Sequence, residues 1–245
     1  MSELVKTRVR PYYKNMPRKN AIKEYVEDGF YHIYNRGVEK RKIFCDKQDY
    51  VVFLRYLKEY LLPADHPNLV SLQRLNPKRK TINCNSEVEL VAFCLMPNHF
   101  HLFLRQKTID GLKNFMKALS TNYVMYFNKK YQRIGPLFQG VYKAVLVKND
   151  SYFLYITRYI HRNPLEILSK TKPLENYDFS SYPVYCAKKC IEWINPNHIL
   201  DNFNNPDRNL SANSHGSYKS FVEESADDEA ENQCLPAEFW IDQES

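Results

Sequence analysis

The sequence has no apolar run that approaches the ~20 residues of a transmembrane helix. Its N-terminus is basic and polar and lacks the apolar core of a secretory signal. The 245-residue chain has only 6 glycines and 6 cysteines, and the cysteines are scattered rather than paired at zinc-finger spacing. These absences argue against membrane, secreted and disulfide-scaffold proteins. We expect a cytoplasmic protein whose thiols are reduced.

The chain does have basic charge and many aromatic residues. Residues 1–200 contain 33 basic and 17 acidic residues, a net charge of +16, whereas residues 201–245 have a net charge of −9. The sequence also contains 19 tyrosines. A basic body rich in tyrosine is typical of a protein that binds a phosphate-bearing polymer such as a nucleic acid. The alternative is that the lysines and arginines only solvate the surfaces of helices.

Composition divides the chain into four parts. A basic arm at 1–28 precedes a domain at 29–185, and a helical extension follows at 186–200. The acidic tail at 201–245 is rich in Asn, Asp, Glu and Ser and has few apolar residues, so we expect it to be disordered.

Apolar periodicity within the domain predicts the order strand, helix, strand, strand, helix, strand, helix. This order suits an α+β fold with an antiparallel sheet. Breakers at 63–81 predict an irregular connection with at most a short strand, and residues 173–200 are expected to be partly helical. The predicted strands lie at 29–37, 88–95, 99–105 and 142–147, and the predicted helices at 46–62, 109–131 and 150–163.

The sharpest local motif is the histidine pair of the segment PNHFHLFL, residues 97–104. In a strand His99 and His101 project from the same face, while Phe100 points to the opposite face and can enter a core. Two adjacent imidazoles can chelate one cation and leave coordination positions open for a ligand oxygen. The alternative is a pair of strand histidines with ordinary hydrogen bonds.

A second motif lies on the last predicted helix of the domain. Tyr159 and Asn163 are four residues apart, so their side chains are neighbours on one face. A phenol beside an amide oxygen fits a nucleophile next to a weak metal ligand. It also fits a tyrosine at the edge of the core followed by an asparagine that caps the helix. Tyr123, Tyr126 and Tyr155 compete for the role of nucleophile.

Five segments together match the motifs of one known family. One position departs from that family's pattern: Val141 stands where the family often has an arginine. The chain from about 29 to 182 resembles the HUH single-tyrosine transposases, and most closely the REP-associated tyrosine transposases of the IS200-like superfamily. The segments are YHIYNRG at 31–37, FCLMPNHFHLF at 93–103, GPLFQGVYKA at 135–144, YIHRNP at 159–164 and YDFSSY at 177–182.

The resemblance implies an HUH endonuclease core: a ferredoxin-like antiparallel sheet with helices packed on it and the histidine pair on a central strand. It implies that His99, His101 and Asn163 bind Mg²⁺ or Mn²⁺. Tyr159 is then the nucleophile that cleaves and rejoins hairpin-bearing single-stranded DNA through a 5′-phosphotyrosine. Whether the chain acts as a monomer or a homodimer is open. The basic residues predicted to contact DNA are Arg36, Lys40, Arg41, Lys143, Lys148, Arg158 and Arg162.

Three other functions compete with this interpretation. The chain could be a catalytically silent, domesticated nucleic-acid-binding module. A metal-dependent hydrolase would need a third histidine or a carboxylate near the pair, and His161 is expected to point elsewhere from its helix. A relaxase or replication initiator uses the same chemistry but typically brings further domains, for which the tail leaves no room.

Overall fold

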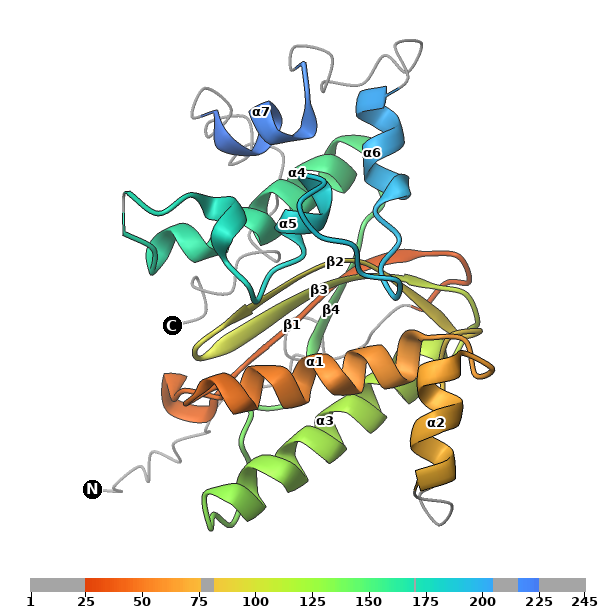
Figure 1. The fold of residues 1–245 in the computed structure, drawn as a ribbon, viewed down its shortest axis with the longest axis vertical. Helices are drawn as coiled ribbons and strands as arrows, with labels where there is room; N and C mark the ends of the chain where they lie inside the picture. The colour runs from red at the N-terminus through yellow and green to blue at the C-terminus, as the bar shows by residue number, and fades with distance from the viewer. Residues whose placement is uncertain (1–24, 76–81, 170, 205–215, 225–245) are drawn as a thin grey trace, which may run out of the picture.

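The computed structural model of the chain describes residues 25–75, 82–169, 171–204 and 216–224 (Figure 1). Strands and helices are interspersed up to β4, and all later elements in the described ranges are helices. In chain order the elements are β1 (Phe30–Arg36), the 3₁₀ helix η1 (Val38–Lys40), α1 (Lys47–Leu61), α2 (Pro67–Leu75), β2 (Val88–Met96), β3 (His99–Gln106), α3 (Gly111–Lys130), β4 (Lys143–Leu146), α4 (Asp150–Arg162), η2 (Asn163–Glu166), η3 (Leu174–Asn176), α5 (Tyr182–Tyr185), α6 (Asn197–Asn204) and α7 (Tyr218–Glu223).

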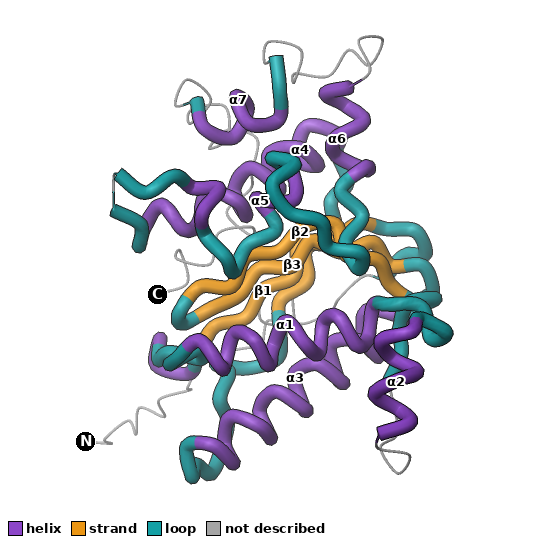
Figure 2. Tube along the Cα trace, viewed as in Figure 1, coloured by secondary structure: helices purple, strands orange, loops and turns teal. Residues whose placement is uncertain are grey.

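The four strands form one sheet in the order β2-β3-β1-β4, and every neighbouring pair is antiparallel. Helix α1 lies on the connection from β1 to β2, and α3 connects β3 to β4, so the chain has the βαββαβ order of a ferredoxin-like fold. Both helices cover one face of the sheet, and α4 to α7 lie on the opposite face (Figures 1 and 2). The predicted α+β fold class is thereby confirmed.

The face under α1 and α3 carries the first hydrophobic core. Helix α1 begins with a capping box: the Asp46 side chain accepts the Asp49 N–H, and the Asp49 side chain accepts the Asp46 N–H. The helix ends at Leu61, just before Pro63. The apolar stripe predicted for the long helix α3 is buried against this core; its residues are Leu112, Phe115, Met116, Leu119 and Tyr123.

The opposite face carries a second core, because side chains of a strand alternate between the two faces of its sheet. Met96 and Phe103 contribute from β2 and β3, and Ile156 and Ile160 contribute from α4. The sheet therefore separates two cores, and any residue that acts together with α4 must lie on the second face.

Three segments differ from the sequence predictions. Residues 67–75 form α2 instead of an irregular connection, because Pro67 at the first helical position favours a helix start and Leu69 is buried. The expectation of a disordered tail is wrong for residues 201–204, which end α6, and for residues 218–223, which form α7. Its Tyr218, Phe221 and Val222 are spaced three and four apart and are buried, a local pattern hidden by the acidic composition of the tail.

The basic arm up to residue 24 and the tail segments 205–215 and 225–245 lie outside the described residues. Within the described ranges, no helix combines the length and the apolar character needed to cross a bilayer. The described cysteines form no disulfide with one another.

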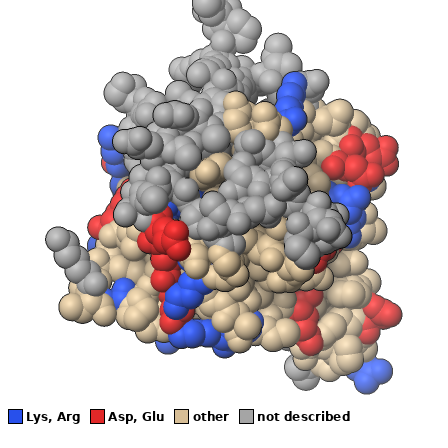
Figure 3. Space-filling model, turned by 90° about the horizontal axis from the view of Figure 1, so that it is seen from above, with Lys and Arg blue, Asp and Glu red and all other residues tan. Residues whose placement is uncertain are grey.

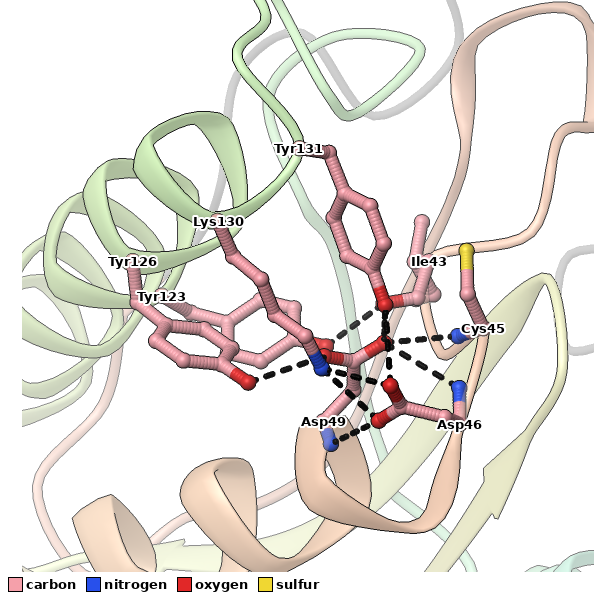
Figure 4. A network of polar contacts seen from close by, with 8 residues as sticks. All are labelled: Ile43, Cys45, Asp46, Asp49, Tyr123, Tyr126, Lys130 and Tyr131. Carbon is pink, nitrogen blue, oxygen red and sulfur yellow. Dashed lines mark hydrogen bonds and ion pairs between the residues drawn. The ribbon is translucent and has the colours of Figure 1, made fainter.

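A buried carboxylate joins the start of α1 to the end of α3 (Figure 4). Asp49 is fully buried, and its oxygens accept hydrogen bonds from the Cys45 N–H at 2.8 Å, the Tyr126 hydroxyl at 2.9 Å, the Tyr131 hydroxyl at 2.8 Å and the Lys130 ammonium at 2.8 Å. Burial opposes the charge, but the hydrogen bonds from Lys130 and Tyr131 outweigh it, so the pKa of Asp49 is lowered. The network fixes the two helices to each other beneath the sheet.

We expect Asp49→Ala to lower the free energy of unfolding by about 3 kcal/mol, because it leaves the Lys130 ammonium without its buried partner. Urea denaturation measures this loss. Asp110→Ala, which removes an exposed ion pair with Lys113, is the control and should cost less than about 1 kcal/mol. Equal losses in the two variants would contradict a structural role for the network.

The same network predicts how stability depends on pH. Because the pKa of Asp49 is lower in the folded chain than in the unfolded chain, its contribution is present above the ordinary aspartate pKa and is lost as the pH falls. The stability difference between the wild type and Asp49→Asn should therefore shrink below about pH 4. Urea titrations at neutral and acidic pH test this, and a difference that grows on acidification would contradict it.

Candidate active site

The histidine pair lies at the start of the central strand β3, which pairs with β2 on one side and β1 on the other. His99 and His101 both face the second core, and Phe100 between them packs into the first core. The two imidazole rings lie 4.9 Å apart, edge to face, and both side chains are buried. The structure thus places the pair on one face of the strand, as its spacing predicts.

Strand β1 adds side chains that the sequence analysis did not consider. Tyr34 lies directly opposite His101 in the register. His32, two residues earlier, places its Nε2 atom 2.8 Å from Nδ1 of His101, with the rings stacked at 5.0 Å. The sequence did contain a signal for these two side chains. His32 and Tyr34 are two residues apart in the strand motif at 31–37, so they share one face of the strand.

Helix α4 brings the tyrosine and the asparagine to the histidines. The Tyr159 ring lies edge-on to His101 at 5.3 Å and to His32 at 6.0 Å between ring centroids. The Asn163 Oδ1 atom is 3.1 Å from Nε2 of His99, and its amide nitrogen donates to the Tyr159 carbonyl oxygen at 2.9 Å. Packing of α4 on the second face therefore gathers residues about sixty positions apart into one site.

Burial keeps His32 and His101 neutral. Burial lowers the pKa of His32 to about 3. Burial and the neighbouring His99 and His32 hold the pKa of His101 well below its usual range, although Asn163 acts in the opposite direction. A neutral His101 that donates from Nδ1 to His32 has a lone pair at Nε2. Within the described part of the chain that buried Nε2 has no hydrogen-bond partner.

His99 lies between two amide oxygens. Its Nδ1 is 2.7 Å from Oδ1 of Asn98, and its Nε2 faces Oδ1 of Asn163. Both amides are oriented by their nitrogens, which donate to the carbonyl oxygens of Lys40 at 3.4 Å and Tyr159 at 2.9 Å. A neutral imidazole has one N–H and can serve only one of the two oxygens. When the proton is on Nδ1 and bonds to the Asn98 oxygen, the lone pair of Nε2 faces the Asn163 oxygen. A cation between these two atoms would be bound by both of them.

The donor set fits a divalent ion. Two imidazole nitrogens and one amide oxygen leave further coordination positions for phosphate oxygens. Among the described residues, no group of three or more His, Cys, Asp and Glu side chains is arranged to hold a metal ion. The third candidate ligand of this site, Asn163, is an amide and does not belong to those residue types.

The competing candidates are occupied elsewhere. Tyr123 lies in the first core and donates to the Ile43 carbonyl oxygen at 2.5 Å, and Tyr126 binds Asp49 on that same side of the sheet. His161 points away from the histidine pair, as expected, with Nδ1 2.6 Å from the Tyr218 hydroxyl and Nε2 2.7 Å from Oγ of Ser181. A third histidine for a hydrolase is therefore not supplied by His161.

A fourth tyrosine, Tyr155, is buried on α4 one turn before Tyr159. Its ring lies 5.3 Å from Phe221 of α7. This contact directs Tyr155 toward α7, whereas Tyr159 contacts the histidines.

Basic residues lie around the strand ends near the histidine pair. Arg36 is directly opposite His99 in the sheet, and its Nε donates to the Gln139 side chain at 3.3 Å. Lys40 and Arg41 belong to the turn at η1, which packs beside the β2–β3 turn because the Gly37 N–H donates to the Asn98 carbonyl at 2.9 Å. A Cβ at Gly37 would lie 2.2 Å from the Arg41 carbonyl oxygen, so only glycine permits this close approach.

Two further predicted DNA-binding lysines lie on the other neighbour of β1. Lys143 pairs with Tyr34 in the register, and Lys148 is exposed just after β4. On the face seen in Figure 3, Lys and Arg side chains lie next to Asp and Glu side chains along the margin of the described surface, so positive charge does not gather into a separate patch there.

The two predicted arginines of α4 are placed differently. Arg158 is fully buried, and its guanidinium donates to the carbonyl oxygens of Phe221 at 2.7 Å and Glu224 at 2.6 Å. Arg162 donates to the Val222 carbonyl oxygen at 2.9 Å. Arg158 therefore bonds to the α7 segment rather than lying at the surface, and we leave it out of the residues proposed to contact DNA.

Comparison with known proteins identifies a family for part of the chain. Residues 70–163 match the family described as "Transposase IS200 like". No curated protein matches the chain. Among solved structures, "Structure of the REP associates tyrosine transposase bound to a REP hairpin" aligns with a TM-score of 0.45 and 12% identity, over 71% of this chain and 95% of that chain.

The matched range contains the histidine pair on β3, Tyr159 on α4 and the asparagine that follows that helix. It also contains the motif at 135–144, whereas the motifs at 31–37 and 177–182 lie outside it. Over residues 70–163 this chain is therefore similar to the IS200-like transposases, the superfamily that the motifs also resemble.

Proposed function

We propose that the chain cleaves and rejoins hairpin-bearing single-stranded DNA by metal-dependent transesterification, with Tyr159 as the nucleophile. The observation that supports this most strongly is the convergence of His99, His101, Asn163 and Tyr159 on one face of the sheet. A transposase of this family needs a nucleophile, an ion site and a phosphate in one place, and these four residues lie together.

The proposed reaction exchanges one phosphodiester for another. The Tyr159 hydroxyl oxygen attacks a backbone phosphorus and gives its proton to solvent. The bond from phosphorus to the 3′ oxygen of the preceding nucleotide breaks, and that oxygen takes up a proton from solvent. The products are a 5′-phosphotyrosine and a free 3′-OH. Because one phosphodiester replaces another, the step needs no ATP and is reversible. A second 3′-OH can attack the phosphotyrosine and rejoin strands.

The tyrosine needs activation. An unperturbed phenol has a pKa near ~10, so roughly one molecule in a thousand is phenolate at pH 7, a deficit of about 4 kcal/mol. We propose that His99, His101 and Asn163 hold Mg²⁺ or Mn²⁺. When bound, such an ion supplies positive charge beside the phosphate oxygens and the phenol.

The remaining parts of the site orient these ligands. The Nε2 atom of His32 lies 2.8 Å from Nδ1 of His101, and we propose that it accepts the Nδ1–H of His101, which leaves the lone pair of His101 Nε2 for the ion. Asn163 is held by the carbonyl oxygen of Tyr159 itself, which couples the amide ligand to the residue that carries the nucleophile. We propose that the phosphate backbone of DNA contacts basic residues near the histidine pair, namely Arg36, Lys40, Arg41, Lys143 and Arg162, and extends to Lys148 beyond the other end of β4.

Tyr159→Phe should abolish covalent adduct formation and leave DNA affinity unchanged, because only the attacking oxygen is lost. The assay incubates the protein with 3′-labelled hairpin oligonucleotides and Mn²⁺ or Mg²⁺ and detects labelled protein on denaturing gels. Tyr152→Phe, on the same helix, is the matched control and should keep the adduct. A full adduct in Tyr159→Phe would assign the nucleophile to another tyrosine. Tight binding without any adduct in the wild type would favour the silent binding module.

His32→Gln should weaken Mn²⁺ binding by about 10- to 100-fold, because the partner that orients a ligating histidine is lost. Calorimetric titration of Mn²⁺ into the purified protein measures the affinity without DNA. His66→Gln, a histidine beyond α1 that pairs with Glu192, is the control and should bind Mn²⁺ as the wild type does. Unchanged affinity in His32→Gln would remove His32 from the proposed ion site.

Affinity for a hairpin oligonucleotide should fall steeply with salt, because phosphate contacts release counterions. Lys40→Ala should make the slope of log K against log salt shallower by about 0.7 to 0.9, the value expected for one lost phosphate contact. Arg55→Ala, on α1 beneath the opposite face of the sheet, is the control. Fluorescence anisotropy at several salt concentrations gives both slopes, and identical slopes in the wild type and Lys40→Ala would exclude Lys40 from the DNA contacts.

A further inference from the structure

Helix α4 is held between the sheet and the α7 segment, which we define as residues 217–224 (Figure 1). One side of the helix packs on β2 and β3 through apolar side chains such as Ile156 and Ile160. The α7 segment contacts a neighbouring side of the same helix. Its polar contacts with α4 involve Arg158, His161 and Arg162, which lie within three residues of Tyr159 in the sequence.

The two arginines bind the end of α7. The last carbonyl groups of a helix have no partner within the helix and need donors from elsewhere. Arg158 donates to the carbonyl oxygens of Phe221 and Glu224, and Arg162 donates to that of Val222. The Arg158 guanidinium also lies 5.9 Å from the centre of the Phe221 ring. Hydrogen bonds of a charged donor to these oxygens have a defined direction, unlike apolar packing.

A chain of hydrogen bonds extends from α7 through α4 to the sheet. The Tyr218 hydroxyl lies 2.6 Å from Nδ1 of His161, and Nε2 of His161 lies 2.7 Å from Oγ of Ser181. Ser181 in turn accepts the Phe93 N–H of β2 at 2.8 Å. All these side chains are buried. These hydrogen bonds link α7 and α4 to strand β2 on the side of α4 that faces away from the histidine pair. They therefore restrict rotation of α4 about its own axis.

We infer that the α7 segment positions the nucleophile helix, so that Tyr218 and Phe221 are positioning residues for Tyr159. This inference rests on the proposed function. The apolar contacts of α4 with the sheet are non-directional and allow small rotations of the helix. A displacement of about 1 Å at a reacting atom can cost about 10²-fold in rate. The directional contacts of Arg158, His161 and Arg162 restrict that rotation at the turn that carries Tyr159.

The opposite role would be occlusion of the site by α7, and the contacts favour positioning. The α7 segment bonds to residues 158, 161 and 162, whereas the ring of Tyr159 contacts His32 and His101. The two roles predict rate changes of opposite sign when α7 is loosened, so one experiment separates them.

The test uses two variants of the full chain that leave every side chain of α4 in place. Phe221→Ala removes an apolar anchor of α7, and Tyr218→Phe removes only the hydroxyl that contacts His161. Tyr177→Phe is the matched control, since it removes a buried hydroxyl that donates to the Leu95 carbonyl in the same core without touching α7. Single-turnover adduct formation and hairpin affinity are measured for each folded variant.

We expect the adduct rate of Phe221→Ala to fall by about 10- to 100-fold. Tyr218→Phe should show a smaller loss in the same direction. Hairpin affinity should stay within about twofold of the wild type, and Tyr177→Phe should react at the wild-type rate. Wild-type rates in both α7 variants would overturn the inference. A rise in rate would overturn it too, because it would show that α7 blocks the site.

Hydrogen exchange separates failure of this inference from failure of the proposed function. If the wild type forms no adduct, the proposed function fails, and the amides of Tyr159 and Ile160 still report on α7. They should be protected in the wild type and exchange faster in Phe221→Ala than in Tyr177→Phe. Equal exchange in the two variants would show that α7 does not restrain α4.

Discussion

Strand β1 runs antiparallel to β3, and the register between them fixes which side chains meet at the histidine pair. Tyr34 lies opposite His101 and Arg36 opposite His99, while His32 reaches diagonally to His101. A shift of one residue would turn all these β1 side chains to the other face of the sheet. The tight approach at Gly37 and its bond to the Asn98 carbonyl hold this register at the end where the histidines lie.

Burial gives the histidines their chemical character. On the surface of a protein an imidazole changes its charge near neutral pH. Inside the second core, the pKa values of His32 and His101 are lowered, so both rings are neutral, and a neutral imidazole can bind a metal ion. The hydrogen bond between them aligns the His101 ring. The buried Nε2 of His101 and the Asn163 oxygen that faces His99 belong to one polar cluster beside the apolar side chains of the second core.

Helix α4 connects this polar cluster to the α7 segment. It supplies Tyr159 and Asn163 on the side of the histidines and Arg158, His161 and Arg162 on the side of the α7 segment. The arginines illustrate how context changes the role of a charge. In sequence, Arg158 beside the proposed nucleophile suggests a contact to phosphate, yet in the fold its guanidinium is buried against backbone carbonyls. The first core, with the Asp49 network under the sheet, supports the strands from the other side.

The sequence by itself determined the strands, most of the helices and the face on which His99 and His101 lie, because these follow from local periodicities of two and 3.6 residues. It also indicated the similarity to the IS200-like transposases, through motifs that extend along much of the chain. Only the tertiary structure decided that His32 is the partner of His101, that Tyr123 lies beyond the sheet and that Arg158 binds α7. Each of these depends on strand register or on packing between segments far apart in the chain. Periodicity contains no information on such pairs, since it reports how one segment faces its surroundings and not which segment it faces.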